Sequence, residues 1–289
     1  METSHTIKIP SKLSMASVDE IYLATIHLHG FYTLIFDFSN VTFVTPEGLI
    51  LLITTSRSFS DRFGHTIEWR NIPTEVLSYM DRMNINDFDF INIIRPSIFK
   101  RINYKPSTAL VEASTIKDAQ QLGQAIIQTR EVLNRWVPES KKDCRQHLST
   151  LIKETVENSI EHSSQEPSNG FCYYILQKYR YSDGSTEIQI AVGDTGIGML
   201  ASQRRVYPDT KDDAEAVIAA LIKGQSGRED GCGGMGYVNI REALAPLSGR
   251  IDIRSGRAHI QHFAGRSYAK IYRHTYSCPG TQIIFHCHT

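Results

Sequence analysis

The chain has 289 residues, 41% of them hydrophobic, which is enough to bury one large core or two modest ones. It carries 31 Lys and Arg residues against 31 Asp and Glu residues, so no overall field would attract nucleic acid or an anionic membrane. The longest apolar run, GLILLI, is too short to span a bilayer and the start, METSHTIKIP, lacks signal-peptide features, so we expect a cytoplasmic protein with no membrane partner.

The first part of the chain alternates between strand and helix patterns. We expect strands at about residues 6–9, 32–40 and 65–72, and helices at about residues 17–29, 49–59 and 74–83. This alternation is typical of a small α/β domain. A stretch that mixes proline and basic residues without a period predicts a linker. The expected division is a domain at 1–88, a linker at 89–104 and a second domain at 105–289.

In the second part, helices and strands come in blocks. We expect a strand at 109–114, then two helices, of which the second covers 141–163, and then paired strands at 171–181 and 186–194. A polar, glycine-rich region follows, and after it a helix at about 236–246 and three strands. This order predicts an α/β sandwich with helices on one face of a mixed, antiparallel-rich sheet.

The second of these helices carries two polar residues beside its apolar stripe. The stripe predicts the buried face and consists of Leu148, Leu151, Ile152, Thr155, Val156 and Ile160. Glu154 and Asn158 lie off the stripe and, four residues apart, stack one turn above the other. A carboxylate can deprotonate an attacking water, and an amide oxygen suits Mg²⁺, which takes few protein ligands beside phosphate oxygens. An ordinary exposed helix face is the alternative.

The strand at 186–194 runs into the segment DTGIG. Asp194 stands at the strand end and is followed by Gly196 and Gly198. Two glycines let the backbone pass close to a flat ligand, while the carboxylate accepts a hydrogen bond from it. Asp and Gly are also among the commonest turn residues, so a tight turn is the alternative.

A glycine-rich segment then leads into a helix, in LIKGQSGREDGCGGMGYVNIREAL. Its four glycines at 231–236 would cost a helix about 4 kcal/mol relative to alanine, so we expect a loop. Backbone N–H groups ahead of a helix N-terminus form a cradle for anions, and Ser226 and Arg228 can add phosphate contacts. A surface loop without a ligand is the alternative.

The same glycines match the dinucleotide-binding fingerprint G-x-G-x-x-G at Gly231, Gly233 and Gly236. In a dinucleotide-binding fold that turn follows directly on a buried parallel strand. The preceding KGQSGRED is no strand. Asp252 would be a tolerable ribose ligand, but the required strand is missing. We therefore do not favour a dinucleotide-binding site.

Three segments together resemble a known family. ETVENSIEH, DTGIG and GCGGMGYVNIREAL, in this order, resemble the N, G1 and G2 boxes of the GHKL ATPases, which include gyrase, heat-shock chaperones, histidine kinases and mismatch-repair ATPases. The resemblance is closest to bacterial anti-sigma serine kinases and the histidine-kinase ATPase domain. With LSGRIDIRSG and PGTQIIFHC behind the boxes, it covers roughly residues 105–289.

This resemblance implies a Bergerat-type fold that binds ATP and Mg²⁺. It implies that Glu154 is the general base, that Asn158 is the Mg²⁺ ligand, and that Asp194 binds the adenine amine. It also implies that GCGGMGY is the hinge of an ATP lid. The further implied residues are Gly196 and Gly198 beneath the base, Gly231, Gly233, Gly234 and Gly236 around the phosphates, and Thr281 supporting the adenine pocket.

The first domain is similar to the STAS domains of anti-sigma antagonists, through YTLIFDFSNVTFVTPEGLILLITTSRSF. In that family a D-S-S-G turn precedes a helix, and its second serine is phosphorylated. This chain has Thr45, Pro46, Glu47 and Gly48 there, so Glu47 stands where the phosphate would be added and the phosphorylation switch is in doubt. A negative charge at a helix start is favourable in any case.

Two features near the end of the chain lie outside these resemblances. Residues 249–274 interleave basic and aromatic side chains and would suit nucleic acid or an acidic partner, although we favour solvated hairpin strands. The basic residues are Arg250, Arg254, Arg257, Arg266, Lys270 and Arg273. The ending FHCHT puts His286 and His288 on one strand face and Cys287 on the other. We therefore favour a solvated strand end over a zinc site.

We therefore expect a GHKL-type regulatory ATPase or serine/threonine protein kinase in a bacterial-type signalling or partner-switching system, with a protein partner or substrate. The alternative is a nucleotide-gated protein-binding module with little or no turnover. Glu154 favours the enzyme, because a pure binder needs no base. The sequence does not identify the phosphoryl acceptor, which can be water, the protein itself or another protein. It does not decide between a monomer and a homodimer.

Overall fold

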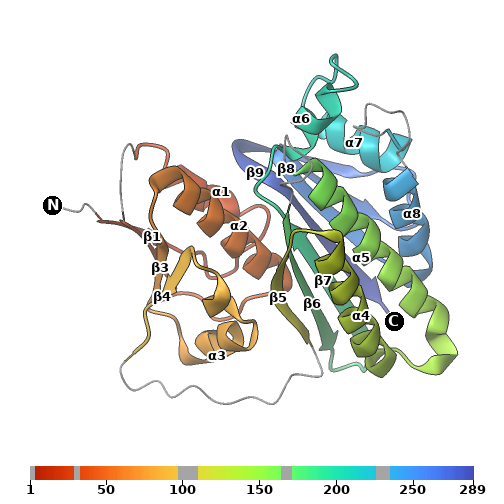
Figure 1. Ribbon diagram of the computed structural model, residues 1–289, viewed down its shortest axis with the longest axis horizontal. Coiled ribbons are helices and arrows are strands. Elements are labelled where there is room, and N and C mark those ends of the chain that lie inside the picture. Colours follow the sequence, from red (N-terminus) through yellow and green to blue (C-terminus); the bar gives the residue numbers. More distant parts are fainter. Residues whose placement is uncertain (1–3, 29–32, 97–109, 164–170, 226–234) are drawn as a thin grey trace. The chain divides into compact units, whose positions relative to one another are not determined.

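The computed structural model describes residues 4–28, 33–96, 110–163, 171–225 and 235–289. The chain divides into two compact units, Met1–Ser107 and Thr108–Thr289 (Figure 1). Both units combine helices with a sheet, so the expected α/β class is confirmed. Among the described residues, no helix has the length and apolarity needed to cross a membrane.

The first unit is built on a four-stranded parallel sheet. Its strands pair in chain order: β1 (Ser4–Lys8), β2 (Thr33–Asp37), β3 (Ile67–Arg70) and β4 (Ile91–Ile93). The helices are α1 (Val18–Leu23), α2 (Pro46–Phe63) and α3 (Thr74–Arg82), with a 3₁₀ turn, η1 (Ile85–Asp87), before β4. Strand β4 lies within the expected linker, where Ile91 pairs with Ile67. A three-residue strand is too short to show a period, which is why the sequence pattern missed it.

Helix α2 follows local rules at both ends. The Thr45 hydroxyl accepts the N–H of Gly48 at 3.1 Å, and Pro46 occupies the first turn, where no backbone donor is needed. Gly64 ends the helix in the left-handed conformation, at φ 74°. Glu47, in the first turn of the helix, accepts the N–H of Met15 at 2.9 Å. Its carboxylate therefore ties the loop before α1 to the start of α2.

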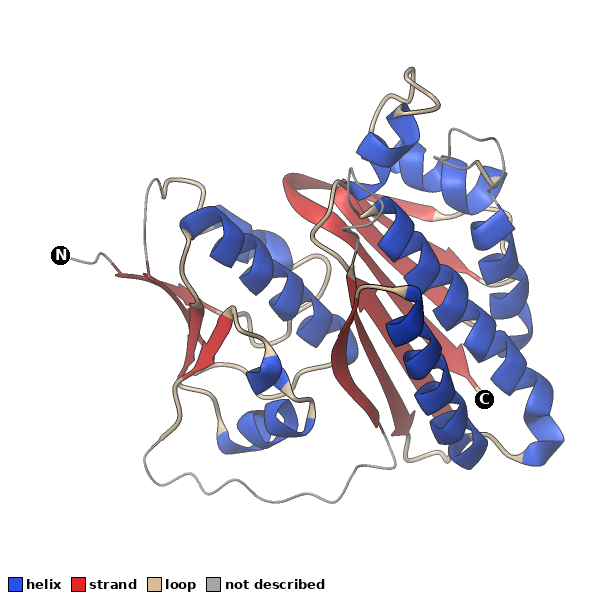
Figure 2. Cartoon of the chain, in the orientation of Figure 1, coloured by secondary structure: helices blue, strands red, loops and turns tan. Residues whose placement is uncertain are grey.

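The second unit is a five-stranded sheet with helices over one face (Figure 2). Its strands are β5 (Leu110–Ile116), β6 (Cys172–Arg180), β7 (Thr186–Gly193), β8 (Arg250–Phe263) and β9 (Lys270–His288), in the order β5-β6-β7-β9-β8. Its helices are α4 (Ala119–Trp136), α5 (Lys142–His162), α6 (Gly198–Arg204), α7 (Asp213–Lys223) and α8 (Met235–Leu244), with 3₁₀ turns η2 (Glu139–Lys141) and η4 (Ala245–Leu247).

The sandwich is as expected, but three details differ. Every neighbouring pair of strands in this sheet is antiparallel, so the sheet is not mixed. Instead of the three late strands expected, the structure has two long ones, β8 and β9. Strand β9 is long because it continues through Pro279 and Gly280 and pairs with β8 on both sides of them. The polar region before α8 contains α6 and α7. Asp212 caps α7 by accepting the N–H of Glu215 at 2.8 Å, and Gly224 ends it at φ 67°.

The core of this unit lies between the helices and the covered face of the sheet. The stripe predicted on α5 is buried there, from Leu148 to Val156. It packs with strand residues such as Ile190, Val192 and Phe285. Glu154 and Asn158 stay half-buried beside the stripe, as expected for residues that lie off its buried face.

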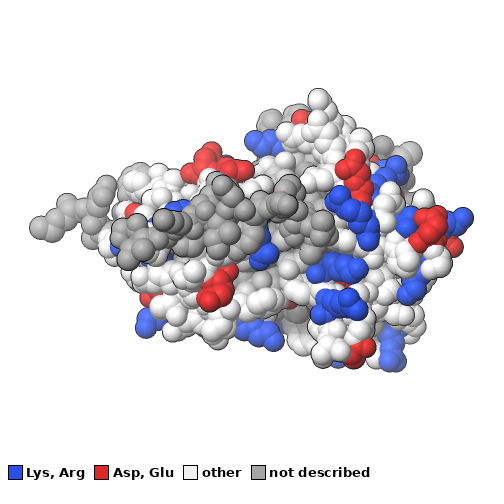
Figure 3. All heavy atoms as spheres, turned by 90° about the horizontal axis from the view of Figure 1, so that it is seen from below, with Lys and Arg blue, Asp and Glu red and all other residues white. Residues whose placement is uncertain are grey.

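The hairpin of β8 and β9 contains the basic stretch. Several of its cations have partners within the protein: Arg254 is fully buried and donates to the Tyr276 carbonyl at 2.8 Å, and Arg250 donates to Asp252 at 2.6 Å. Arg254 is therefore not part of a solvated strand. Across the face drawn in Figure 3, acidic side chains lie among basic ones.

The strand end at FHCHT alternates as expected, but of its two histidines His288 is exposed while His286 is not, so this strand end is only partly solvated. Cys287 lies in the core, while His286 lies on the opposite face and its Nδ1 is 2.6 Å from Glu187 Oε1. The His286 interaction, together with the Tyr181 and Gln189 hydrogen bonds, lowers the pKa of Glu187 to about 2 although burial acts in the opposite direction. The described residues contain no group of three His, Cys, Asp or Glu side chains placed to hold a metal.

Candidate functional site

A pocket opens in the second unit between the end of α5, the end of β7 and helices α6, α7 and α8. Its empty volume, the open mouth included, is about 640 Å³. Five of the residues expected to bind a nucleotide or its metal ion line it, namely Asn158, Asp194, Gly198, Gly236 and Thr281.

Asp194 follows directly after β7 and is 3% exposed. Burial raises the pKa of its carboxyl to about 7, and two backbone hydrogen bonds act in the opposite direction. Its Oδ1 accepts the N–H of Gly196 at 2.8 Å and that of Thr281 at 3.3 Å. A buried carboxyl in this state favours a ligand that brings a hydrogen-bond donor, because such a bond offsets the cost of ionisation.

The glycines around Asp194 allow close backbone approach. A Cβ on Gly196 would lie 1.6 Å from the carbonyl oxygen of Ser163, and one on Gly280 would lie 2.1 Å from that of Asp194. Gly280 and Gly198 also have positive φ angles, of 68° and 74°. Gly198 lines the pocket, whereas Gly196 is packed against the end of α5.

Thr281 supports Asp194 from β9. Its carbonyl accepts the Asp194 N–H at 2.9 Å, and its own N–H donates to the side-chain Oδ1 of Asp194 at 3.3 Å. Its hydroxyl is 3.2 Å from the Ser255 hydroxyl, which accepts the N–H of Met199 at 2.9 Å. This chain of contacts fixes the wall of the pocket next to Asp194.

The start of α8 meets the polar side of α5. A Cβ on Gly236 would lie 3.2 Å from Glu154 Oε2 and 3.3 Å from Asn158 Oδ1. Asn239 donates from Nδ2 to Glu154 Oε1 at 2.9 Å, so one oxygen of this carboxylate is held by α8. The Nδ2 of Asn158 is buried and has no hydrogen-bond partner among the described residues, which leaves a donor available for an anionic oxygen.

The structure thus gathers most of the predicted residues around one pocket, with Glu154 beside it. Ser226, Arg228, Gly231, Gly233 and Gly234 lie outside the described residues. Several lining residues were not predicted: Ser159, His162, Ser163, Met199, Ser202, Gln203, Ala220, Gln225, Tyr237 and Ile283. Only His162 had a local signal, since it lies four residues beyond Asn158 on the same helix. Its Nδ1 is 3.3 Å from the Ser202 hydroxyl.

The donor set fits the groups that the resemblance implies. A purine amine would find an acceptor in Asp194, with Gly198 and Thr281 alongside. Mg²⁺ requires few protein ligands when phosphate and water supply the rest, and the amide oxygen of Asn158 is a suitable one. Glu154 and Asn158 both approach Gly236, so a carboxylate, an amide and a helix start converge there.

No family model matches this chain, and no curated protein does. Among solved structures, the chain is similar to one in the crystal structure of the SiaB–SiaC complex from Pseudomonas aeruginosa, with 10% sequence identity and a TM-score of 0.33. The match covers 63% of this chain and 90% of that chain. At this identity and TM-score, the likeness carries no functional argument.

Proposed function

We propose that the second unit binds ATP with Mg²⁺ and acts as a GHKL-type regulatory ATPase or serine/threonine protein kinase in a partner-switching or related signalling system. The observation that carries the proposal is the convergence on one pocket of Asn158, Asp194, Gly236 and Thr281, which come from four separate segments of the sequence. Chance placement of these four residue types around one cavity is a poor alternative explanation, because the sequence motifs single them out independently of any geometry.

Each residue has a distinct role in this proposal. The carboxylate of Asp194 accepts a hydrogen bond from the adenine amine. Asn158 binds Mg²⁺ through its amide oxygen, and its buried Nδ2 donates to a phosphate oxygen. The bound metal supplies positive charge against the charge that develops on the transferred phosphoryl group. Glu154, oriented by Asn239, accepts the proton of the attacking hydroxyl or water.

The alternative is a module that closes on nucleotide and presents a surface to a partner, with little or no turnover. The half-buried carboxylate of Glu154 favours the enzyme, because binding alone does not require a base beside the pocket. The two functions share Asp194 and Asn158 and differ in Glu154.

The test begins with calorimetry of ATP, with and without Mg²⁺, on the whole chain. Incubation with γ-labelled ATP then follows the label into inorganic phosphate, into the protein itself or into an added candidate protein substrate. Absence of ATP binding at millimolar concentration would refute the proposal. Binding without any release or transfer of label would favour the nucleotide-gated module.

A further inference from the structure

Gln203 is a buried amide in the pocket wall that the proposed chemistry leaves unused. It lies on α6, is 3% exposed and lines the pocket. Its Nε2 donates to the backbone carbonyl of Gln225 at 3.1 Å. A carbonyl can only accept, so this bond fixes which end of the amide is nitrogen. The other end, Oε1, is buried and has no hydrogen-bond partner within the part of the chain that the structure describes.

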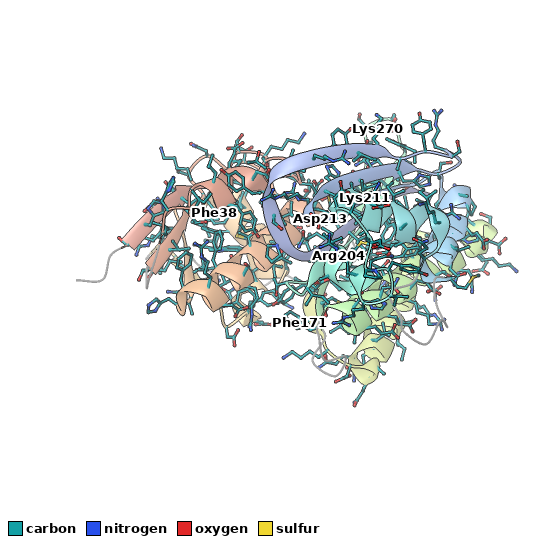
Figure 4. The ribbon with its side chains drawn as sticks, turned by 90° about the horizontal axis from the view of Figure 1, so that it is seen from above. Phe38, Phe171, Arg204, Lys211, Asp213 and Lys270 are labelled. Carbon is teal, nitrogen blue, oxygen red and sulfur yellow. The ribbon has the colours of Figure 1, made fainter. Side chains whose placement is uncertain are left out.

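The amide is held between two anchored segments. The backbone carbonyl of Gln203 accepts the N–H groups of Val206 and Tyr207, at 3.1 and 2.8 Å. Next to it, the Arg204 guanidinium donates to the carbonyls of Thr210 and Lys211, at 2.9 and 3.0 Å; Arg204 and Lys211 are labelled in Figure 4. The oxygen of Gln203 is therefore an acceptor held in place before any ligand arrives.

A buried acceptor without a partner costs free energy, and a ligand that supplies a donor recovers it. ATP at neutral pH has only two kinds of donor, the exocyclic amine of adenine and the two hydroxyls of the ribose. Its phosphates and ring nitrogens only accept. Asp194 accepts only one of the two N–H groups of the amine, so the donors left for a second acceptor in the same pocket are the other amine N–H and the ribose hydroxyls. Deoxy analogues of ATP lack only a hydroxyl, so they tell these two kinds of donor apart.

Resting on the proposed function, we infer that Gln203 Oε1 accepts a hydrogen bond from a ribose hydroxyl, so the site selects ribonucleotides over deoxyribonucleotides. A site that hydrogen-bonds a hydroxyl rejects an analogue lacking it, because the buried acceptor is then left unpaired. One such bond corresponds to a preference of about tenfold or more.

The test compares the affinities of ATP, 2′-deoxy-ATP and 3′-deoxy-ATP by calorimetry on the whole chain. We expect wild type to bind one deoxy analogue at least tenfold more weakly than ATP. Gln203→Met keeps the length of the side chain but has no amide oxygen. It should weaken ATP binding by a similar factor and leave the affinity for that analogue unchanged. Gln128→Met, at an exposed position on α4, is the matched control and should keep the wild-type preference.

The outcomes separate the two proposals. If wild type does not bind ATP, the proposed function fails. If it binds ATP and both analogues equally, the function stands and the role of Gln203 is refuted. Equal weakening of all three ligands by Gln203→Met would also refute the role, since it would reveal a structural effect. The analogue comparison on wild type needs no variant, so equal binding of all three ligands would refute the role of Gln203 even if Gln203→Met fails to fold.

Discussion

Replacing Asp194 by Asn should stabilise the ligand-free second unit at neutral pH while weakening nucleotide binding. Burial raises the folded-state pKa of this carboxyl from 3.8 to about 7. The folded protein therefore holds the proton more tightly than the unfolded chain does. The stability that this provides is complete below pH 3.8 and is lost as the pH rises through about 7.

The size of the effect follows from the shift. Three pKa units correspond to about 4 kcal/mol, so wild type should lose stability of that order between pH 4 and pH 8. The introduced amide would not titrate, and its oxygen can still accept the N–H groups of Gly196 and Thr281. The buried amide nitrogen has no hydrogen-bond partner, which lowers the free energy of unfolding of the variant by about 1–3 kcal/mol. The net gain at pH 8 should be about 1–3 kcal/mol, and at pH 4, where the wild-type carboxyl is protonated, the variant should instead be less stable by about 1–3 kcal/mol.

The assay is urea denaturation at several pH values without nucleotide. The chain has two tryptophans, Trp69 in the first unit and Trp136 in the second, so a Trp69→Phe background leaves buried Trp136 to report on the second unit. Calorimetry on the same variant should show ATP binding weakened by about 1–3 kcal/mol, because the amine loses its acceptor. An Asp194→Asn variant with the pH profile of wild type, or with unchanged ATP affinity, would refute the reasoning.

Four further predictions concern the candidate base, the metal ligand and the first unit. Glu154→Gln should lower turnover about 10²–10⁴-fold and leave ATP affinity nearly unchanged, and Glu131→Gln on the exposed face of α4 is the control. Equal turnover in wild type and both variants would count against the enzyme. Asn158→Ala should weaken ATP binding only with Mg²⁺ present, and an equal loss in EDTA would exclude a role as metal ligand. Asn239→Asp should destabilise the protein by placing two carboxylates together. Adding Glu154→Gln should restore about 0.5–3 kcal/mol, because the new amide at 154 can donate to the new carboxylate at 239. If the two substitutions have additive effects on stability in urea, the contact is unimportant. Glu47→Ser should acquire no phosphate with Mg-ATP, and a phosphoserine there by intact mass and peptide mapping would show that a kinase still reaches the turn.

Local patterns predicted the parts of the site that lie on single elements. The buried stripe of α5 fixed the orientation of Glu154 and Asn158, and the apolar run of β7 placed Asp194 at a strand end. Both follow from periodicity, which needs only neighbouring residues. The extent of β9 was harder to predict, because Pro279 and Gly280 indicate a break, whereas the strand continues past them with an irregular register against β8.

Gln203 was missed for a related reason. Glycines and charged residues surround the short helices α6 and α7, so the sequence pattern of its segment indicates only a polar loop. Its amide becomes significant only when the end of α7 brings the Gln225 carbonyl beside it, 22 residues further along the chain. A contact of that kind has no period and no fixed spacing, so it becomes visible only in the folded chain.

The close packing at Gly196 limits which substitutions the second unit can accept. Any side chain there would collide with the Ser163 carbonyl, and one at Gly280 would collide with the backbone of Asp194. Gly123, on α4, has no described atom within 4 Å of an added Cβ and should accept alanine with a gain in helix stability. In a library of random variants selected for folding, substitutions should therefore accumulate at Gly123 and stay absent at Gly196 and Gly280. The backbone around Asp194 would then resist substitution whatever ligand it serves.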